Sequence, residues 1–168
     1  MLNKIDKLSQ TEFIEVFGNI FENAGWISEK LYTQKPFKNF GDLSKKMISI
    51  FEDANDQNKL KILKSHPDLA DKTKIGLLTE DSDKEQNHAE LDQCTEGEYI
   101  EFKNLNSQYK SKFAFPFIIA VVGKKKPEIL SIFKKRILNS KKIEFDESIK
   151  QVIQIASLRL NILKIKFL

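Results

Sequence analysis

The sequence predicts an all-α fold, a single-domain bundle of about eight helices with one extended buried segment near residues 115–122. Apolar residues recur at spacings of three and four along most of the chain, which is the period of an α-helix. Three capping boxes, each a Ser or Thr followed three positions later by Glu, mark helix starts at Ser9, Ser82 and Thr95. The one β-branched run has no second run of similar quality with which to form a sheet.

In the N-terminal half, helical spacing predicts four helices. Gly25 is expected to stop the first, and Pro36 ends the second. Pro67 ends the fourth, because a proline disfavours the helical conformation in the residue before it. The predicted ranges are residues 9–24, 26–34, 39–54 and 56–65.

The C-terminal half is predicted to hold four more helices, preceded by turns over residues 68–79. Pro127 suits the first turn of the third of these helices, because its missing N–H is not needed there. The run of residues 115–122 is buried but not helical, so its amides and carbonyls must find other partners. The predicted helices cover residues 82–91, 95–113, 127–138 and 145–168.

At 168 residues the chain is about the size of one domain, and we expect a single domain over residues 1–168. No apolar run approaches the ~20 residues that cross a bilayer, and the first residues lack the apolar core of a signal peptide. The single cysteine, Cys94, gives neither an internal disulfide nor a metal-binding cluster. We therefore expect a cytoplasmic protein with no membrane partner.

The charge balance argues against a nucleic-acid partner. Some of the basic residues cluster at 124–126, 134–136 and 141–142. The 28 basic residues of the chain are nearly matched by 24 acidic ones, and no nucleic-acid motif accompanies the clusters. A basic helical binding module stays open as an alternative, and it would bind in a salt-sensitive way.

Arginine occurs only at Arg136 and Arg159, so this chain uses lysine wherever a generic positive charge suffices. The two arginines indicate positions that need a planar guanidinium able to donate two directed hydrogen bonds. Arg159 projects toward the apolar side of the last helix, where a buried guanidinium requires an anionic or carbonyl partner. That partner is either a structural carboxylate or a bound substrate.

His66 is a candidate general base, because it lies at a corner stiffened by Pro67 and histidine titrates near neutral pH. The alternative is a histidine that favours a helix C-terminus through the helix dipole. Glu85 is likewise open to two interpretations, since it can complete the capping box of Ser82 or take part in chemistry.

Four stretches carry a more specific pattern, in a fixed order along nearly the whole chain. They are Ser65-His66-Pro67-Asp68-Leu69-Ala70, Leu78-Thr79 with Ser82-x-x-Glu85-Gln86, Lys112-Phe113-Ala114-Phe115-Pro116-Phe117-Ile118-Ile119-Ala120-Val121, and Ile155-Ala156-x-Leu158-Arg159-Leu160. Shorter matches are Phe17-Gly18-x-Ile20-Phe21-Glu22, Lys35-Pro36-Phe37, Leu91-Asp92 and Leu105-Asn106-x-x-Tyr109. This ordered set resembles the 2-oxo-4-hydroxy-4-carboxy-5-ureidoimidazoline (OHCU) decarboxylase family, enzymes of urate degradation.

The resemblance implies an all-α domain that decarboxylates a small-molecule substrate, OHCU, without a cofactor or metal and yields (S)-allantoin and carbon dioxide. It implies that His66 and Glu85 are the catalytic pair and that the protein is a homodimer. The implied substrate-binding residues are Pro67, Ser82, Gln86, Arg159 and the backbone of Phe117, Ile118, Ile119, Ala120 and Val121.

The chain departs from the family pattern at four positions. Asp71, Glu90 and Ala114 stand where the family usually has glycine, and Val122 stands where arginine is common. None of the four is an implied catalytic position, so the departures concern the substrate loops more than the reaction.

A metal-dependent hydrolase is the rival enzyme class. Glu85-x-x-His88 places a carboxylate and an imidazole on one helical face, and His66 could complete a three-ligand site. Resistance of the activity to a chelator would separate the two enzyme classes.

Overall fold

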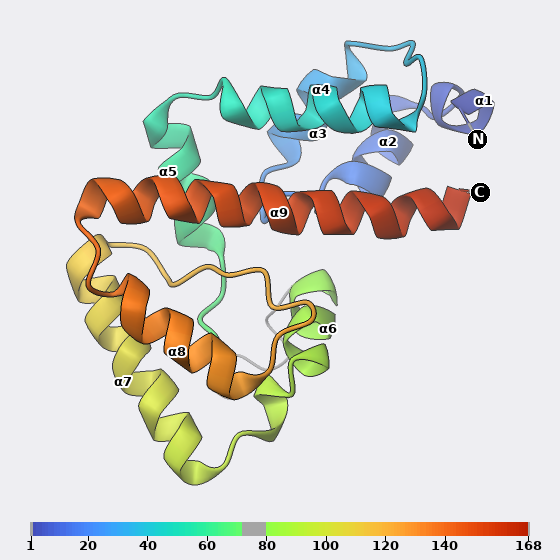
Figure 1. Ribbon diagram of the computed structural model, residues 1–168. Helices are drawn as coiled ribbons and strands as arrows, with labels where there is room; N and C mark the ends of the chain where they lie inside the picture. Colours follow the sequence, from blue (N-terminus) through green and yellow to red (C-terminus); the bar gives the residue numbers. More distant parts are fainter. Residues whose placement is uncertain (1, 72–79, 168) are drawn as a thin grey trace. The chain divides into compact units, whose positions relative to one another are not determined.

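The structure of the protein is a computed structural model that describes residues 2–71 and 80–167, without the side chains of residues 2, 3, 88 and 167. Within these ranges every regular element is an α-helix or a 3₁₀ helix, which confirms the all-α prediction. The elements are α1 (Leu2–Asp6), α2 (Gln10–Phe17), α3 (Gly25–Tyr32), α4 (Phe40–Glu52), α5 (Asp56–Ser65), α6 (Glu80–His88), the short 3₁₀ helix η2 (Leu91–Gln93), α7 (Glu96–Phe113), α8 (Lys126–Arg136) and α9 (Lys141–Phe167) (Figure 1).

The chain forms two compact units. Unit 1 comprises Met1–Ile62 and Ile153–Leu168, and unit 2 comprises Leu63–Val152. Helices α5 and α9 each contribute residues to both. A single domain over residues 1–168 stays a prediction.

Unit 1 is built on α2, α3 and α4, in which α3 contacts both of the others. The predicted capping box at the start of α2 is confirmed, because the Ser9 N–H donates to Glu12 Oε2 at 2.8 Å and Ser9 Oγ accepts from the Glu12 N–H at 3.3 Å. The inward faces are apolar and aromatic, and the fully buried side chains include Phe13, Phe17, Phe21, Ile27, Leu31, Leu43 and Phe51.

The prediction that the first helix reaches Gly25 is wrong. Helix α2 ends at Phe17, and Gly25 begins α3 instead of stopping the helix before it. At Gly18 a Cβ atom would lie 2.5 Å from the Ile14 carbonyl oxygen, so the close approach at this helix end requires glycine. The following turn passes through Asn23, whose φ of 51° is incompatible with a continuing helix.

Unit 2 contains α6, η2, α7, α8 and the first part of α9. The capping box of Thr95 and Glu98 at the start of α7 is confirmed, as is the place of Pro127 in the first turn of α8. Helix α9 begins at Lys141 and not at Phe145, because Ser140 accepts hydrogen bonds from the first turn of the helix. The Ser140 carbonyl accepts from the Glu144 N–H at 3.0 Å, and its hydroxyl accepts from the Ile143 N–H at 3.4 Å.

The extended buried segment is confirmed. After α7 the chain runs without regular structure from Phe115 to Val121 before turning into α8 (Figure 1). The whole run is buried and includes Phe117 and Ala120 at 1% and 2% exposure. The chain enters the segment through Ala114, which caps α7 in the left-handed conformation with φ 64°.

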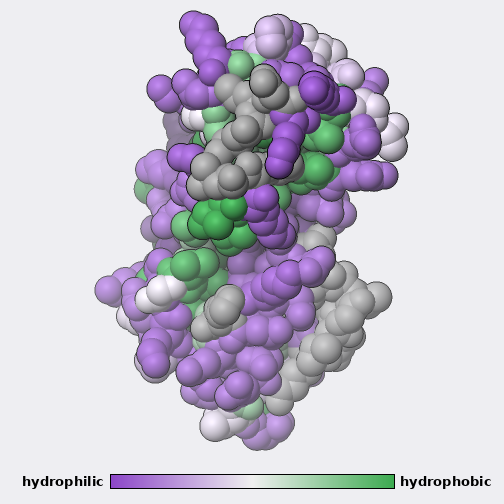
Figure 2. Space-filling model, turned by 90° about the vertical axis from the view of Figure 1, so that its right-hand side faces the viewer, coloured by the Kyte–Doolittle hydropathy of each residue, from purple (hydrophilic) through white to green (hydrophobic). Residues whose placement is uncertain are grey.

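None of the described helices is long and apolar enough to span a membrane. On the face shown in Figure 2, hydrophilic side chains dominate and hydrophobic ones gather in a few patches. The large hydrophobic side chains that are exposed include Ile100, Val122, Leu138, Ile143, Ile162 and Ile165.

Candidate active site

His66 lies where the sequence predicts, at the corner that follows α5. The helix ends at Ser65, and the His66 N–H still donates to the Leu63 carbonyl at 3.3 Å. The residues after Pro67 leave the helix, and the side chains of both His66 and Pro67 are half-buried. The imidazole is thus held near the end of a helix and keeps access to solvent or ligand.

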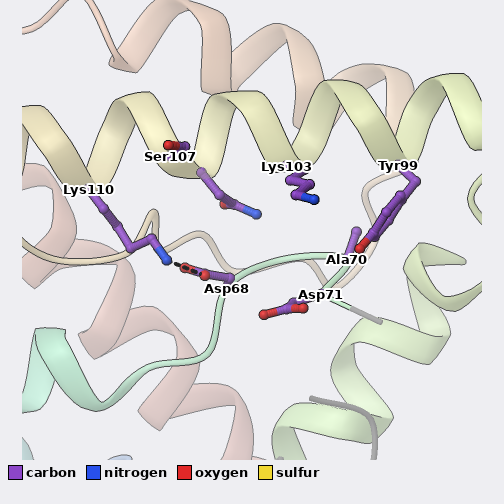
Figure 3. Close-up of a pocket in the computed structure, with 8 residues that line it drawn as sticks. Asp68, Ala70, Asp71, Tyr99, Lys103, Ser107 and Lys110 are labelled. Carbon is purple, nitrogen blue, oxygen red and sulfur yellow. Dashed lines mark hydrogen bonds and ion pairs between the residues drawn. The ribbon is translucent and has the colours of Figure 1, made fainter. Parts of the chain in front are cut away.

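Helix α7 holds the chain that follows this corner. Asn106 Nδ2 donates to the Leu69 carbonyl at 2.9 Å, and Lys110 Nζ forms an ion pair with Asp68 Oδ2 at 2.5 Å. Figure 3 shows the Lys110 and Asp68 side chains pointing toward one another. Asp68 and Asn106 are both buried, whereas the Lys110 side chain is 45% exposed, so the amide contact is shielded from solvent and the ion pair lies at the surface.

Helix α6 is tied to the same stretch by Gln86. Its Oε1 accepts from the Ala70 N–H at 3.0 Å, and its Nε2 donates to the Asp68 carbonyl at 3.3 Å. Gln86 therefore lies beside the backbone that follows His66, and its amide already serves that backbone. Whether it also contacts a substrate stays a prediction.

Ser82 and Glu85 lie on the same face of α6 as Gln86, because positions three and four residues apart are neighbours on a helix. Ser82 and Gln86 are buried, whereas Glu85 is half-buried. The structure thus brings the segment that carries Glu85 to the segment that carries His66, within unit 2.

The predicted helix start at Ser82 is wrong. Helix α6 begins at Glu80, so Ser82 lies inside the first turn and is not the capping residue. Glu85 consequently does not occupy the third position of a capping box, and the purely local role that the sequence allowed for it is removed. The acidic side chains of Glu80, Asp81 and Asp83 in the first turn favour the earlier start through the helix dipole.

The extended segment is held from one side by two polar side chains of unit 2. Arg136 Nη1 donates to the Ile118 carbonyl at 2.7 Å, and Gln151 Oε1 accepts from the Ala120 N–H at 2.9 Å. The Val121 carbonyl accepts from the Lys124 N–H at 2.9 Å. The need for partners outside a sheet, which the sequence indicated, is met in part by these groups.

Arg159 is buried in unit 1, on α9, as its place in the apolar arc predicts. Its Nη1 donates to Glu22 Oε2 at 3.1 Å and to the Asn19 carbonyl at 3.0 Å. The arginine therefore has both an anionic and a carbonyl partner within the protein. Because Arg159 belongs to unit 1, and His66 and Glu85 to unit 2, its role as a substrate ligand stays a prediction.

A cavity of about 450 Å³ adjoins the His66 corner on its α7 side. In Figure 3 its walls carry both lysines and aspartates, and Tyr99 and Lys103 extend from α7 toward the chain at Ala70 and Asp71. Neither His66 nor Glu85 lines this cavity. The lining residues are Asp68, Ala70, Asp71, Tyr99, Lys103, Asn106, Ser107 and Lys110.

The metal-site alternative rests on the side chain of His88, which lies outside the described residues, as do Leu78 and Thr79. In the described part of the chain, no group of three or more His, Cys, Asp or Glu residues could hold a metal ion. The proposal of a His66, Glu85 and His88 site is therefore left untested.

The sequence missed Asn106 and Lys110 as supports of the corner, although Asn106 was part of a recognised motif. The available signal was the place of Asn106 on the predicted apolar face between Leu105 and Tyr109, since buried amides need hydrogen-bond partners.

The described part of the chain is all-α, and Gln86 ties α6, the helix that carries Glu85, to the backbone that follows the corner of His66 and Pro67. The sequence profile of the OHCU decarboxylase family matches residues 6–161. The chain belongs to the OHCU decarboxylase family.

Curated relatives agree with this assignment. The chain is 33% identical, over 95% of its length and 93% of the relative's, to the 2-oxo-4-hydroxy-4-carboxy-5-ureidoimidazoline decarboxylase of Haloferax volcanii. It is 33% identical to the protein of that name from Xenopus laevis, over 91% of the relative. It is 38% identical to the uric acid degradation bifunctional protein of Bacillus sp. (strain TB-90), of which it spans only 31%.

Two solved structures share the fold. A crystal structure of (S)-allantoin synthase matches 97% of this chain with a TM-score of 0.76 at 24% identity, and the match spans 54% of that protein. A crystal structure of OHCU decarboxylase in the presence of (S)-allantoin matches 91% of this chain and 96% of its own, with a TM-score of 0.70 at 21% identity.

Proposed function

We propose that this protein decarboxylates OHCU to (S)-allantoin and carbon dioxide, the last step of urate degradation to allantoin, without a cofactor. The family match supports the reaction, and one structural observation supports the site. Gln86 joins the helix that carries Glu85 to the backbone that follows His66, which supports the proposal that the imidazole and the carboxylate act together. Two such groups suit a reaction that needs controlled proton transfer.

The substrate supplies its own electron sink. The carbon that bears the leaving carboxylate also bears a hydroxyl and adjoins a C=N bond of the ring. When the C–C bond to the carboxylate breaks, its electron pair moves into that C=N system and carbon dioxide departs. The protein therefore has to orient the molecule and control protonation of the enediol-like intermediate on one face.

His66 and Glu85 divide the proton transfers. His66 hydrogen-bonds the substrate hydroxyl and removes or relays its proton, and Glu85 polarises the site and delivers the proton that sets the configuration of the product. General acid–base groups of this kind typically contribute about 10²–10⁴-fold to the rate.

The remaining predicted residues orient the substrate. We propose that Pro67 and the buried Ser82 contact the substrate, and that the backbone from Phe117 to Val121 contributes amides and carbonyls. Arg159 supplies a guanidinium fork for the substrate carboxylate or a ring carbonyl.

We further propose that the protein is a cytoplasmic homodimer that engages no nucleic acid. Light scattering of the purified protein at two salt concentrations tests the dimer. Salt-sensitive retention on a nucleic-acid column would instead support a basic binding module.

The reaction is tested by carbon dioxide release. OHCU labelled with ¹³C at its carboxylate, generated from urate by oxidation and hydrolysis, is mixed with the protein and followed by NMR. The proposal predicts rapid appearance of labelled carbonate, unchanged after dialysis against a strong chelator. Loss of turnover on chelation, restored by a divalent metal, would contradict the cofactor-free mechanism and support a metal site of His66, Glu85 and His88.

A further inference from the structure

Arg136 is the second of the two arginines of this chain, and the proposed reaction gives it no role. Its guanidinium is buried and uses every one of its nitrogens. Nε and Nη2 donate to Glu144 Oε1 at 2.9 and 2.6 Å, and Nη2 also donates to Ser148 Oγ at 3.2 Å. The remaining nitrogen, Nη1, donates to the Ile118 carbonyl at 2.7 Å.

The carboxylate of Glu144 fixes this guanidinium. Glu144 is fully buried, and it also accepts from the Tyr109 hydroxyl and from Asn139 Nδ2, the latter at 2.7 Å. Burial and the hydrogen bond to Glu144 raise the pKa of Tyr109, so the phenol remains a donor throughout the neutral range.

Aromatic rings also contact the Arg136 guanidinium. It lies 4.6 Å from the centre of the Phe117 ring, and that ring stacks on Phe133 with 3.8 Å between the ring centres. The network leaves Arg136 one orientation, in which Nη1 faces the extended segment.

Gln151 acts on the same segment two residues further on. Its Oε1 accepts from the Ala120 N–H, while its Nε2 donates to Glu147 Oε1 at 2.9 Å, which orients the amide. Arg136 and Gln151 therefore hold polar backbone groups of Ile118 and Ala120, the residues on either side of Ile119.

Ile119 is buried, with 5% exposure, and its N–H and C=O form no hydrogen bond with any residue that the structure describes. Buried backbone groups are nearly always paired, so this pair calls for a partner. A substrate with ring N–H and carbonyl groups, as OHCU has, matches one donor and one acceptor on the same residue.

We infer that Arg136 and Gln151 are positioning residues that fix the extended segment so that the backbone N–H and C=O of Ile119 bind the substrate ring. This inference rests on the proposed function for the identity of the substrate. Neither side chain touches the reacting atoms, and each acts through the backbone that it holds.

The test removes the acceptor at Gln151, because Arg136 variants are more prone to unfold. Gln151→Met keeps the length of the side chain and loses the hydrogen bond to Ala120. We expect kcat/KM for OHCU to fall by about 10²-fold, mainly in kcat, because small displacements of a bound substrate cost rates of that order. Gln154→Met, at an exposed position of the same helix, is the matched control and retains wild-type kinetics.

A paired exchange provides the rescue. Gln151→Glu combined with Glu147→Gln restores an acceptor for the Ala120 N–H and a donor between the two side chains. We expect this double variant to retain most of the wild-type kcat/KM that Gln151→Met loses. A Gln151→Met protein that is folded, with kcat/KM within about twofold of wild type, would overturn the inference. So would failure of the exchange to recover activity in a folded protein.

Hydrogen exchange separates this inference from the proposed function. If wild-type protein releases no carbon dioxide from OHCU, the proposed function fails, and the positioning role is judged on the backbone alone. We expect Gln151→Met to speed amide exchange over residues 117–121 at least tenfold, and Gln154→Met to leave it unchanged. Equal exchange in the two variants would overturn the positioning role even if the enzyme is active.

Discussion

Arg159 and Glu22 form a buried ion pair, with 3.1 Å between Nη1 and Oε2 and side-chain exposures of 3% and 2%. The same nitrogen reaches the Asn19 carbonyl. Loss of one partner from a buried pair typically costs about 3–5 kcal/mol, because the other charge is left uncompensated. The pair gives Arg159 a structural role that can be separated by experiment from its predicted role as a substrate ligand.

For Arg159→Lys, we expect lower stability and a fall in kcat/KM of about 10²-fold, because lysine keeps the charge but loses the fork that orients the substrate. Glu22→Gln is the matched variant, since it weakens the pair and leaves the arginine in place. It should lower the melting temperature and leave KM unchanged. If the two variants lose stability equally and neither alters the kinetics, Arg159 serves only the ion pair.

His66→Ala is expected to lower kcat by about 10²–10⁴-fold and to leave the melting temperature close to that of wild type. The corner itself is maintained by Pro67 and by the contacts of Asp68 and Leu69 with α7. Lys64→Ala, exposed on the same helix, serves as the control. Steady-state kinetics with thermal unfolding decides the matter, and retained turnover with reduced stability would make His66 a structural helix-end residue.

Glu85→Gln tests the carboxylate without changing its size. Because α6 begins at Glu80, Glu85 is not part of a helix cap, and we expect normal stability with kcat reduced about 10²–10⁴-fold. Glu128→Gln, an exposed residue of α8, controls for the loss of one negative charge. Near-normal turnover of Glu85→Gln would remove Glu85 from the mechanism.

Two of the positions at which the family usually has glycine are strained in this chain. Glu90 and Ala114 have φ values of 60° and 64°, in the left-handed region where a side chain costs about 1 kcal/mol. We expect Glu90→Gly and Ala114→Gly each to raise the melting temperature by about 1–4 °C, measured by calorimetry.

Ser111→Gly is the control for Ala114→Gly, because Ser111 has ordinary helical conformation near the end of α7, the helix that Ala114 caps. There glycine should destabilise by roughly 0.5–1 kcal/mol. A drop in melting temperature for both Ala114→Gly and Ser111→Gly would show that the left-handed backbone at Ala114 carries no strain.

Local signals predicted most of the fold. Sequence spacing sufficed to place the signals that act within one helical turn. These are the helix caps at Ser9 and Thr95, the proline in the first turn of α8, Pro127, and the corner at Pro67. The same reasoning failed at Ser82, because the acidic residues before it allow the helix to start earlier. It failed at Gly25, because α2 ends at Phe17 and the turn through Asn23, with φ 51°, separates it from α3.

The candidate site was less predictable, because its supports join residues far apart in the chain. Helical spacing predicted the burial of Arg159, whereas the catalytic pair of His66 and Glu85 comes from the family resemblance and stays a prediction. No local pattern links Gln86 to Ala70 or Asn106 to Leu69. The scarcity of arginine was the useful exception. Arg136 and Arg159 are both buried and paired with glutamate, as the need of a buried guanidinium for an anionic partner indicated.

The most direct test of the central claim is the chirality of the product, followed by circular dichroism as freshly formed OHCU decays. Spontaneous decay gives racemic allantoin without an ellipticity signal, whereas stereospecific protonation gives the (S) form. We predict that wild-type protein produces a rapid signal of (S)-allantoin and that His66→Ala, at equal concentration, produces almost none. Decay that stays optically silent with folded wild-type protein would contradict the account.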